Sequence, residues 1–173
     1  LILGWLYFLH VRILLLIEKN CVVTLDYTVF DTNETLLDSG STPLTYLHGG
    51  YGDLFDKIEE ALEGKGVGES IHLQLSPKDS FGEYKEELVL IDNRNAFEDD
   101  IEVGQHVEML FNEDEEDASE MMITYTITDI YEDKVVLDAN HPLAGVTIIF
   151  DATVIGIREA TAQEVEAKIH PDK

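Results

Sequence analysis

Acidic side chains are the most abundant groups in this sequence that could do chemistry, with 36 Asp and Glu residues against 11 Lys and Arg. Two carboxylates across a cleft can hydrolyse a glycosidic bond, but nothing in the sequence fixes such a pair. The run EDEEDASE (113–120) lacks the spacing of a calcium-binding loop, so we expect a solvated turn between two strands. The segment GKGVGES (64–70) lacks the Gly-Lys-Ser/Thr of a phosphate-binding loop and is also expected to be a turn.

The charge balance narrows the range of partners. A formal net charge of −25 argues against a nucleic-acid partner, because binding to phosphates needs a basic face. It also disfavours docking on anionic lipid. The one cysteine, Cys21, cannot form a disulfide within the chain, so we expect a reducing, cytoplasmic setting. The six His residues are scattered, and we expect no metal and no cofactor.

The first 17 residues, LILGWLYFLHVRILLLI, differ from the rest of the sequence. This apolar run is slightly short for a bilayer span, which needs about 20 residues. It carries Arg12 in its middle, which costs about 2.5–3.5 kcal/mol on insertion scales. Three interpretations stay open: a start assigned too far upstream or a fragment, a membrane anchor or signal, and a genuine soluble helix. Membrane association is therefore expected only if residues 1–17 are an anchor.

Beyond this leader, the spacing of apolar residues predicts strands and one main helix. CVVTLDYTVF (21–30) and IHLQL (71–75) alternate as half-buried strands do. In DLFDKIEEALEG (53–64) the apolar residues fall at helical spacing. Asp53 and Gly64 are placed to cap this helix at its two ends.

Residues 88–138 have a different composition from the segments on either side. They hold sixteen acidic and two basic residues, yet VEMLF, MMITYTITDI and KVVL alternate as short strands do. The chain then returns to a strand at 147–157, and Thr161 with Glu164 predicts a capping box at the start of a last helix. We therefore expect an α+β fold with an antiparallel sheet, one main helix and an inserted β-rich unit.

Three separated blocks, in the right order, resemble FKBP-type peptidyl-prolyl isomerases. They are LDYTVFDTNETLLDSG, PLTYLHGGYGDLFDKIEEALEGKGVGE and LSPKDSFGEY, and LDANHPLAGVTIIFDATVIGIREAT then resembles the SlyD-like branch of that family. The resemblance covers about residues 19–166 and implies an FKBP-like antiparallel sheet of five or six strands wrapped on one helix. It divides the chain into the leader (1–17), a discontinuous isomerase domain (18–87 and 139–166), an insert-in-flap chaperone domain (88–138) and a tail (167–173).

The resemblance also implies a proline pocket. Its catalytic positions fall on Tyr27, Asp38, Phe55, Phe81 and Phe150, and its substrate-binding positions fall on Leu37, Tyr46, Leu54 and Ile58. The backbone N–H of Phe55 would donate to the substrate carbonyl, Ile58 would lie at the pocket floor, and Phe150 would contact the proline ring. From composition alone, such aromatic residues on strands more often only fill a core.

The sequence departs from the family pattern at three places. The loop between Gly49 and Gly52 is one residue longer, and Asp56-Lys57 stands where the family has Pro-Gly before the helix. Phe81 replaces a residue that is usually Tyr, so one hydroxyl is missing from the expected pocket. The His- and Cys-rich metal-binding tail of the family has no counterpart in these 173 residues.

The resemblance implies a peptidyl-prolyl cis-trans isomerase that is also a folding chaperone. Its partners would be unfolded or proline-containing polypeptides, and we expect a monomer. A non-catalytic holdase that binds unfolded chains is the alternative. Seven apolar residues of the insert would either offer an adaptable surface to unfolded segments or form the insert's own small core. They are Phe97, Val103, Val107, Met109, Phe111, Met121 and Met122.

Overall fold

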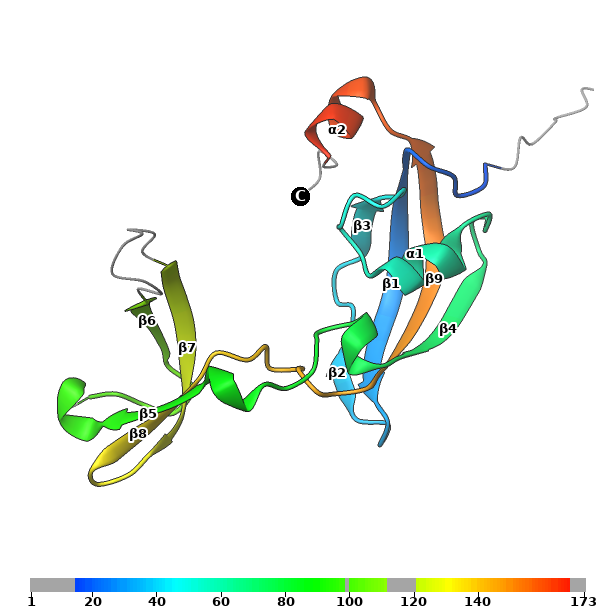
Figure 1. The fold of residues 1–173 in the computed structure, drawn as a ribbon. Coiled ribbons are helices and arrows are strands. Elements are labelled where there is room, and N and C mark those ends of the chain that lie inside the picture. The colour runs from blue at the N-terminus through cyan, green and yellow to red at the C-terminus, as the bar shows by residue number, and fades with distance from the viewer. Residues whose placement is uncertain (1–14, 99, 112–120, 169–173) are drawn as a thin grey trace, which may run out of the picture. The chain divides into compact units, whose positions relative to one another are not determined.

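A computed structural model of the chain describes residues 15–98, 100–111 and 121–168. The predictions for most of the leader, for the turn at 113–120 and for the tail beyond Lys168 lie outside the described residues. The chain divides into two compact units (Figure 1). The first unit comprises the residues up to Ser80 and those from Thr147 onward, and the second unit is Phe81–Val146.

The first unit is built on one antiparallel sheet of five strands. The strands are β1 (Cys21–Asp31), β2 (Leu36–Asp38), β3 (Leu44–Leu47), β4 (Ser70–Leu75) and β9 (Ile148–Glu159). They lie in the order β2-β1-β9-β4, and β3 also pairs with β1. The strands predicted at 21–30, 71–75 and 147–157 are therefore confirmed, whereas the short strands β2 and β3 were not predicted.

Strand register decides which side chains share the inner face of this sheet. Val29 of β1 pairs with Phe150 of β9, and Tyr27 pairs with Ala152. Side chains directly opposite in an antiparallel pair lie on the same face. Leu25 and Val154, one step further along, have no exposed surface. The inner face therefore carries the apolar core of the first unit, and Tyr27 continues the same row.

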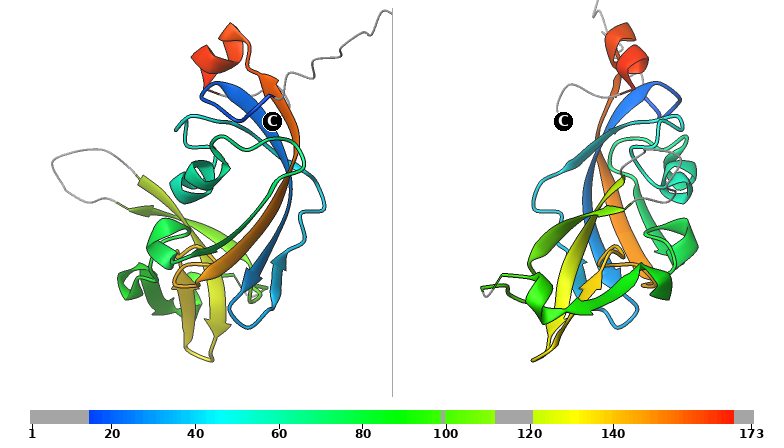
Figure 2. Two further views of the ribbon diagram at one scale, coloured as in Figure 1. Left: turned by 90° about the vertical axis from the view of Figure 1, so that its right-hand side faces the viewer. Right: turned by 60° about the vertical axis from the view of Figure 1, so that its left-hand side comes forward.

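Helix α1 (Asp56–Leu62) lies on the concave side of the curved sheet (Figure 2). Ile58 and Leu62, one turn apart, are at most 1% exposed, as the predicted apolar stripe requires. The predicted start at Asp53 is wrong, because the N-cap position is Phe55 and makes no side-chain cap. The Asp53 carboxylate instead accepts the backbone N–H of Leu47 at 3.2 Å. A contact with the end of β3, six residues earlier in the chain, thus takes the side chain that local sequence assigned to the cap.

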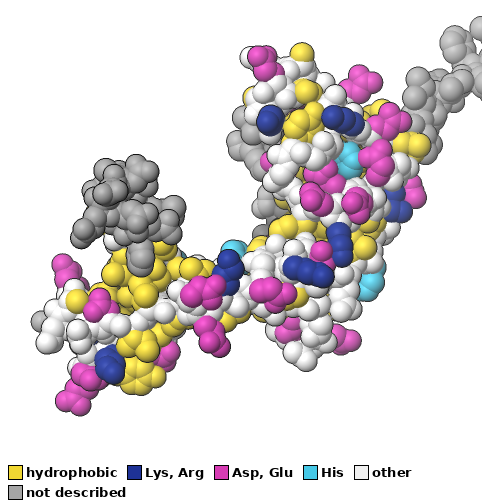
Figure 3. All heavy atoms as spheres, viewed as in Figure 1, with side chains coloured by type: hydrophobic (Ala, Val, Ile, Leu, Met, Phe, Trp, Pro, Cys, Tyr) yellow, Lys and Arg dark blue, Asp and Glu magenta, His cyan; other side chains and the backbone are white. Residues whose placement is uncertain are grey.

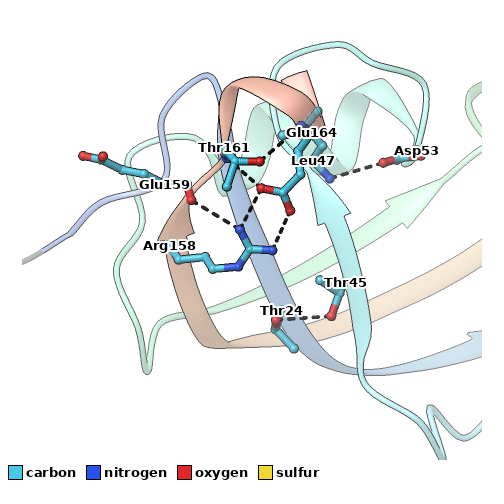
Figure 4. Close-up of polar contacts among 8 residues, drawn as sticks. All are labelled: Thr24, Thr45, Leu47, Asp53, Arg158, Glu159, Thr161 and Glu164. Carbon is cyan, nitrogen blue, oxygen red and sulfur yellow. Dashed lines mark hydrogen bonds and ion pairs between the residues drawn. The ribbon is translucent and has the colours of Figure 1, made fainter. Parts of the chain in front are cut away.

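Helix α2 (Ala162–Ala167) begins with the predicted capping box (Figure 4). The Glu164 backbone N–H donates to the Thr161 hydroxyl at 3.2 Å, and the Thr161 backbone N–H donates to the Glu164 carboxylate at 2.6 Å. Arg158 of β9 donates to both oxygens of the same carboxylate, at 2.7 and 3.0 Å. The Arg158 guanidinium, followed by the Thr161 N–H, lowers the pKa of Glu164 to about 2.

The second unit is a four-stranded antiparallel sheet in the order β5-β8-β7-β6. Its strands are β5 (Val89–Asn93), β6 (His106–Phe111), β7 (Met121–Ile130) and β8 (Lys134–Asp138), which confirms the three alternating segments. Tyr125, Ile127, Val135 and Leu137 form its buried core. Phe97, Val107 and Met109 pack against this core, whereas Val103 and Met122 are about 60% exposed. The side chains of Phe111 and Met121 lie outside the description.

The two ends of the second unit are joined to each other. The Phe81 ring stacks on His141 with centroids 4.3 Å apart, and the Tyr84 hydroxyl donates to Asp138 at 2.9 Å. The Asn140 amide donates to the Lys85 carbonyl and accepts the Lys85 N–H, at 2.8 and 2.9 Å. The chain therefore enters and leaves this unit through one cross-linked pair of segments.

Mostly antiparallel sheets with two α-helices confirm the predicted α+β class. Three short 3-10 turns complete the described elements, at Pro77–Asp79, Glu86–Leu88 and Arg94–Ala96. Over the described ranges, no helix has the length and apolar character that a membrane crossing requires.

Candidate active site

Tyr27 and Asp38, both predicted as catalytic positions, are brought together by the pairing of β1 with β2. Asp38 lies opposite Val29, two residues from Tyr27, and the Tyr27 hydroxyl donates to Asp38 Oδ2 at 2.8 Å. The Gly40 backbone N–H donates to Asp38 Oδ1 at 2.9 Å. Both carboxylate oxygens are thus held by donors from the first unit.

Gly40 is a site-positioning residue that the sequence analysis missed. Its φ is +57°, and a Cβ built there would lie 1.9 Å from the Tyr27 carbonyl oxygen. Only glycine permits this backbone conformation together with so close an approach. The signal was present in Asp38-Ser-Gly40, because Asp followed two residues later by a turn glycine is typical of an Asx turn.

The hydrogen bonds fix the protonation states of the pair. The Gly40 N–H, and then the Tyr27 hydroxyl, lower the pKa of Asp38. Partial burial, and then the bond to Asp38, raise the pKa of Tyr27. At neutral pH the site therefore presents an ionised, solvent-exposed carboxylate beside a protonated phenol.

Phe150 joins Tyr27 to make an aromatic surface. The two rings stack with centroids 5.7 Å apart and planes inclined by 19°. Phe150 is only 4% exposed and lies between Val29 of β1 and Leu73 of β4, whereas Tyr27 is half-buried. The pair therefore extends the apolar inner face of the sheet as far as Asp38, whose charged side chain is exposed.

The residues predicted at the start of α1 line a separate hollow of the first unit. Leu54 and Phe55, both half-buried, border a cavity of about 270 Å³ together with the segment Lys78–Ser80. Lys57 closes one side of this cavity by donating to Asp79 at 2.8 Å. Ile58 is 1% exposed, so it belongs to the packed core beneath α1.

Three predicted residues have other surroundings. Tyr46 has no exposed surface, and its hydroxyl lies 2.9 Å from His48 Nδ1, so it is a core residue and not an open wall of a pocket. Leu37 is half-buried at a register shift between β1 and β2. Phe81 belongs to the second unit, where it stacks on His141. Substrate contact by these residues stays a prediction.

The arrangement in the first unit offers binding and no obvious group for covalent chemistry. It consists of stacked aromatic rings, a carboxylate held by two donors, and apolar side chains at the start of α1. Among the residues whose positions are described, no group of three or more His, Cys, Asp or Glu side chains is arranged to hold a metal ion. Such a surface can grip an apolar ring and a peptide group through shape and hydrogen bonds.

Comparisons with known proteins identify the family. No family model matches the chain. The chain is 36% identical over 153 residues to an FKBP-type peptidyl-prolyl cis-trans isomerase SlyD of Haemophilus influenzae, which covers 86% of this chain and 76% of that protein. The SlyD proteins of Vibrio cholerae and Escherichia coli are 35% and 36% identical over the same length, covering 72% and 74% of those proteins. The chain therefore belongs to the family of FKBP-type peptidyl-prolyl cis-trans isomerases, in its SlyD branch.

Proposed function

We propose that this protein is a peptidyl-prolyl cis-trans isomerase and folding chaperone that acts on X-Pro bonds in unfolded or partly folded proteins. Membership of the SlyD branch supports the activity. The single structural observation that carries the proposal is the meeting of Tyr27, Asp38 and Phe150 on the first unit. We assign the first unit as an FKBP-like isomerase domain and the second unit as its inserted chaperone domain.

The reaction needs no nucleophile, because no bond is broken. Amide resonance sets a barrier of about 18–20 kcal/mol to rotation, and an X-Pro bond isomerises in tens to hundreds of seconds. The twisted transition state has lost this resonance and is less dipolar than the planar amide. A surface such as the Tyr27–Phe150 pair, from which water is partly excluded, therefore stabilises the twisted amide relative to the planar one.

Each residue of the proposed site has a distinct task. Phe150 and Tyr27 hold the proline ring against the inner face of the sheet. Asp38 keeps the Tyr27 hydroxyl oriented and faces the twisting amide with a fixed negative charge. The backbone N–H of Phe55 anchors a substrate carbonyl, so that rotation takes place about one bond while the rest of the peptide stays in place.

The proposed chaperone activity rests on exposed apolar side chains of the second unit (Figure 3). Leu110 of β6 lies opposite Met122 of β7, and the two are 61% and 60% exposed. Ile91, Val103 and Tyr131 are also more than half exposed. Exposed apolar patches on a monomer mark interaction surfaces, and a flexible Met adapts to partners of different shape. Unfolded segments are the partners that such a surface suits.

An isomerisation assay on a short proline-containing peptide tests the proposed enzyme. We expect turnover by the native protein and a loss of about tenfold or more in Phe150→Leu, which keeps an apolar side chain but removes the stacked ring. Urea unfolding checks that Phe150→Leu stays folded. The matched control is Ile155→Val, which alters an exposed residue of the same strand and should keep native turnover. Full activity in a folded Phe150→Leu variant would show that the site lies elsewhere.

A holdase without useful catalysis is the second candidate, and the exposed Leu110–Met122 pair favours it. It predicts suppressed aggregation of a denatured client with no acceleration of peptide isomerisation. The double variant Leu110→Ser/Met122→Ser should lose aggregation suppression, and on our proposal it should keep peptide turnover. Val67→Ser/Ile155→Ser, which removes two exposed apolar residues from the first unit, is the control for surface hydrophobicity.

A further inference from the structure

An ion pair joins the start of α1 to the turn that follows β4, and the proposed mechanism gives it no task. Lys57, in the first turn of α1, donates to Asp79 Oδ2 at 2.8 Å. The two residues border the hollow of about 270 Å³ that Leu54 and Phe55 also line. Lys57 belongs to the Asp56-Lys57 pair at which the sequence departs from the family pattern. The family pattern therefore does not explain this ion pair.

Asp79 is the fixed member of the pair. Its carboxylate also accepts the Ser76 hydroxyl, and its backbone N–H donates to the Ser76 carbonyl at 2.9 Å. The turn is closed further by the Ser80 backbone N–H, which donates to the carbonyl of Pro77 at 3.0 Å. The Lys57 ammonium, and then the Ser76 hydroxyl, lower the pKa of Asp79, so the carboxylate is ionised at neutral pH. The Asp79 carboxylate thus has a set position, which the longer Lys57 side chain reaches.

The start of α1 is the part of the helix that needs such a contact. The N-cap residue Phe55 makes no side-chain cap, and Asp56 is exposed. Ile58 and Leu62 bury the helix only from its third residue onward. A helix of seven residues is marginal by itself, so its first turn frays unless tertiary contacts hold it. Lys57 supplies a tertiary contact at the second helical residue.

Phe55 lies between two side-chain contacts that hold the backbone. Two residues before it, the Asp53 carboxylate accepts the Leu47 backbone N–H at 3.2 Å. Two residues after it, Lys57 binds Asp79. Leu47 belongs to β3 and Asp79 to the turn after β4, so the two contacts reach different parts of the first unit. The backbone between Asp53 and Lys57, which includes the Phe55 N–H, is therefore held at both ends.

We propose that Lys57 and Asp79 are positioning residues, whose ion pair holds the Phe55 N–H in place for the carbonyl of a bound client. This inference rests on the proposed function, because it acts through that N–H. The client carbonyl stays bound in both the planar and the twisted state, so the contact stabilises the two states equally. Loss of the ion pair should therefore raise KM and leave kcat almost unchanged. A variant that is only less folded would instead lose kcat at the native KM.

Isomerisation kinetics on a short, uncharged, proline-containing peptide test the proposal. Lys57→Met removes the charge and nearly keeps the size of the side chain, and Asp79→Asn keeps an acceptor for the Ser76 hydroxyl. Partly exposed ion pairs contribute modestly, so we expect each variant to raise KM about threefold. The double variant Lys57→Met/Asp79→Asn should raise KM no further, because either change alone already breaks the pair.

Two controls separate the ion pair from the general charge of the protein. Lys65→Met removes a lysine from a different pair of the first unit, Lys65–Glu69, and should keep the native KM. Lys57→Arg retains the charge at the same position and should also keep it. An equal rise of KM in Lys65→Met and Lys57→Met would overturn the proposal. Losses that multiply in the double variant, or a fall in kcat at the native KM, would overturn it as well.

Calorimetric titration with the same peptide distinguishes failure of this inference from failure of the proposed function. If the peptide binds but is not turned over, the proposed isomerase activity fails, whereas weaker binding by Lys57→Met and Asp79→Asn still supports the positioning role. Equal affinity of the native protein and both variants would overturn the positioning role even in an active isomerase. A native protein that neither binds nor turns over the peptide would overturn both proposals.

Discussion

The hydrogen bond between Tyr27 and Asp38 gives the sharpest test of the proposed isomerase site. Tyr27→Phe removes the donor, and Asp38→Asn removes the charge of the acceptor, while each nearly keeps the size of the side chain. If the two residues act as a unit, the double variant should lose no more activity than the more damaged single variant. A double-mutant cycle in kcat/KM measures this coupling.

The magnitude follows from the geometry of the pair. A hydrogen bond to a charged group contributes about 1.5–3 kcal/mol where water is excluded. Here the 2.8 Å bond ends on an exposed carboxylate, so solvent competition reduces the coupling to about 1 kcal/mol. Since 1.4 kcal/mol corresponds to a factor of ten, we expect each single variant to lose about fivefold in kcat/KM. The same coupling should appear in the free energy of unfolding in urea.

The assay is isomerisation of a short proline-containing peptide, with Tyr131→Phe as the control. Tyr131 is an exposed tyrosine of the second unit, so its variant should match the native protein in both measurements. Losses that simply multiply in the double variant would refute the reasoning, because they would show that the Tyr27 hydroxyl and the Asp38 carboxylate act independently.

Three further results are expected for the first unit. Gly40→Ala should lower the free energy of unfolding by more than about 1–2 kcal/mol, which is the cost of left-handed backbone for a residue with a Cβ. The loss should be larger because the added Cβ would meet the Tyr27 carbonyl. Gly52→Ala is the control, because Gly52 has a similar φ but open space around it. Thr161→Ala should weaken α2 by about 1 kcal/mol, seen as faster amide exchange. The stability that Glu164 contributes should be complete above the pKa of this residue in the unfolded chain, near 4.5, and should be lost as the pH falls toward 2. Titration of Glu164 by NMR measures its pKa in the folded protein. Arg158→Gln should raise the pKa of Glu164.

Local patterns predicted the elements that depend on local forces. Alternation located β1 and β4, and the Thr161–Glu164 spacing located the start of α2, because each signal lies within a few residues. Strand β3 escaped notice since it has four residues and is defined by its pairing with β1. Asp53 was wrongly assigned as the N-cap, because α1 begins only at Asp56 and the Asp53 carboxylate accepts the backbone N–H of Leu47 in β3.

The candidate site was predictable only through family resemblance. Neither spacing nor composition indicates that Tyr27 and Asp38 touch, because their contact depends on the turn that brings β2 back to β1. The complete burial of Tyr46 and its contact with His48 were not predicted, because they depend on packing within the folded first unit. The burial of Glu59 was not predicted, because it depends on the backbone N–H groups of Gly49 and Gly50 in the loop before α1.

The joined ends of the second unit have a consequence for how the chain folds. While Phe81–Val146 is unfolded, pairing of Leu75 in β4 with Ile148 in β9 must close a loop over residues 76–147. Once the Phe81–His141 stack and the Tyr84–Asp138 bond have formed, the same closure leaves only residues 76–80 and 142–147 free. The logarithmic dependence of closure entropy on loop length makes this difference about 1.7 kcal/mol. Early folding of the second unit would thus spare the first unit part of the entropic penalty of the interruption.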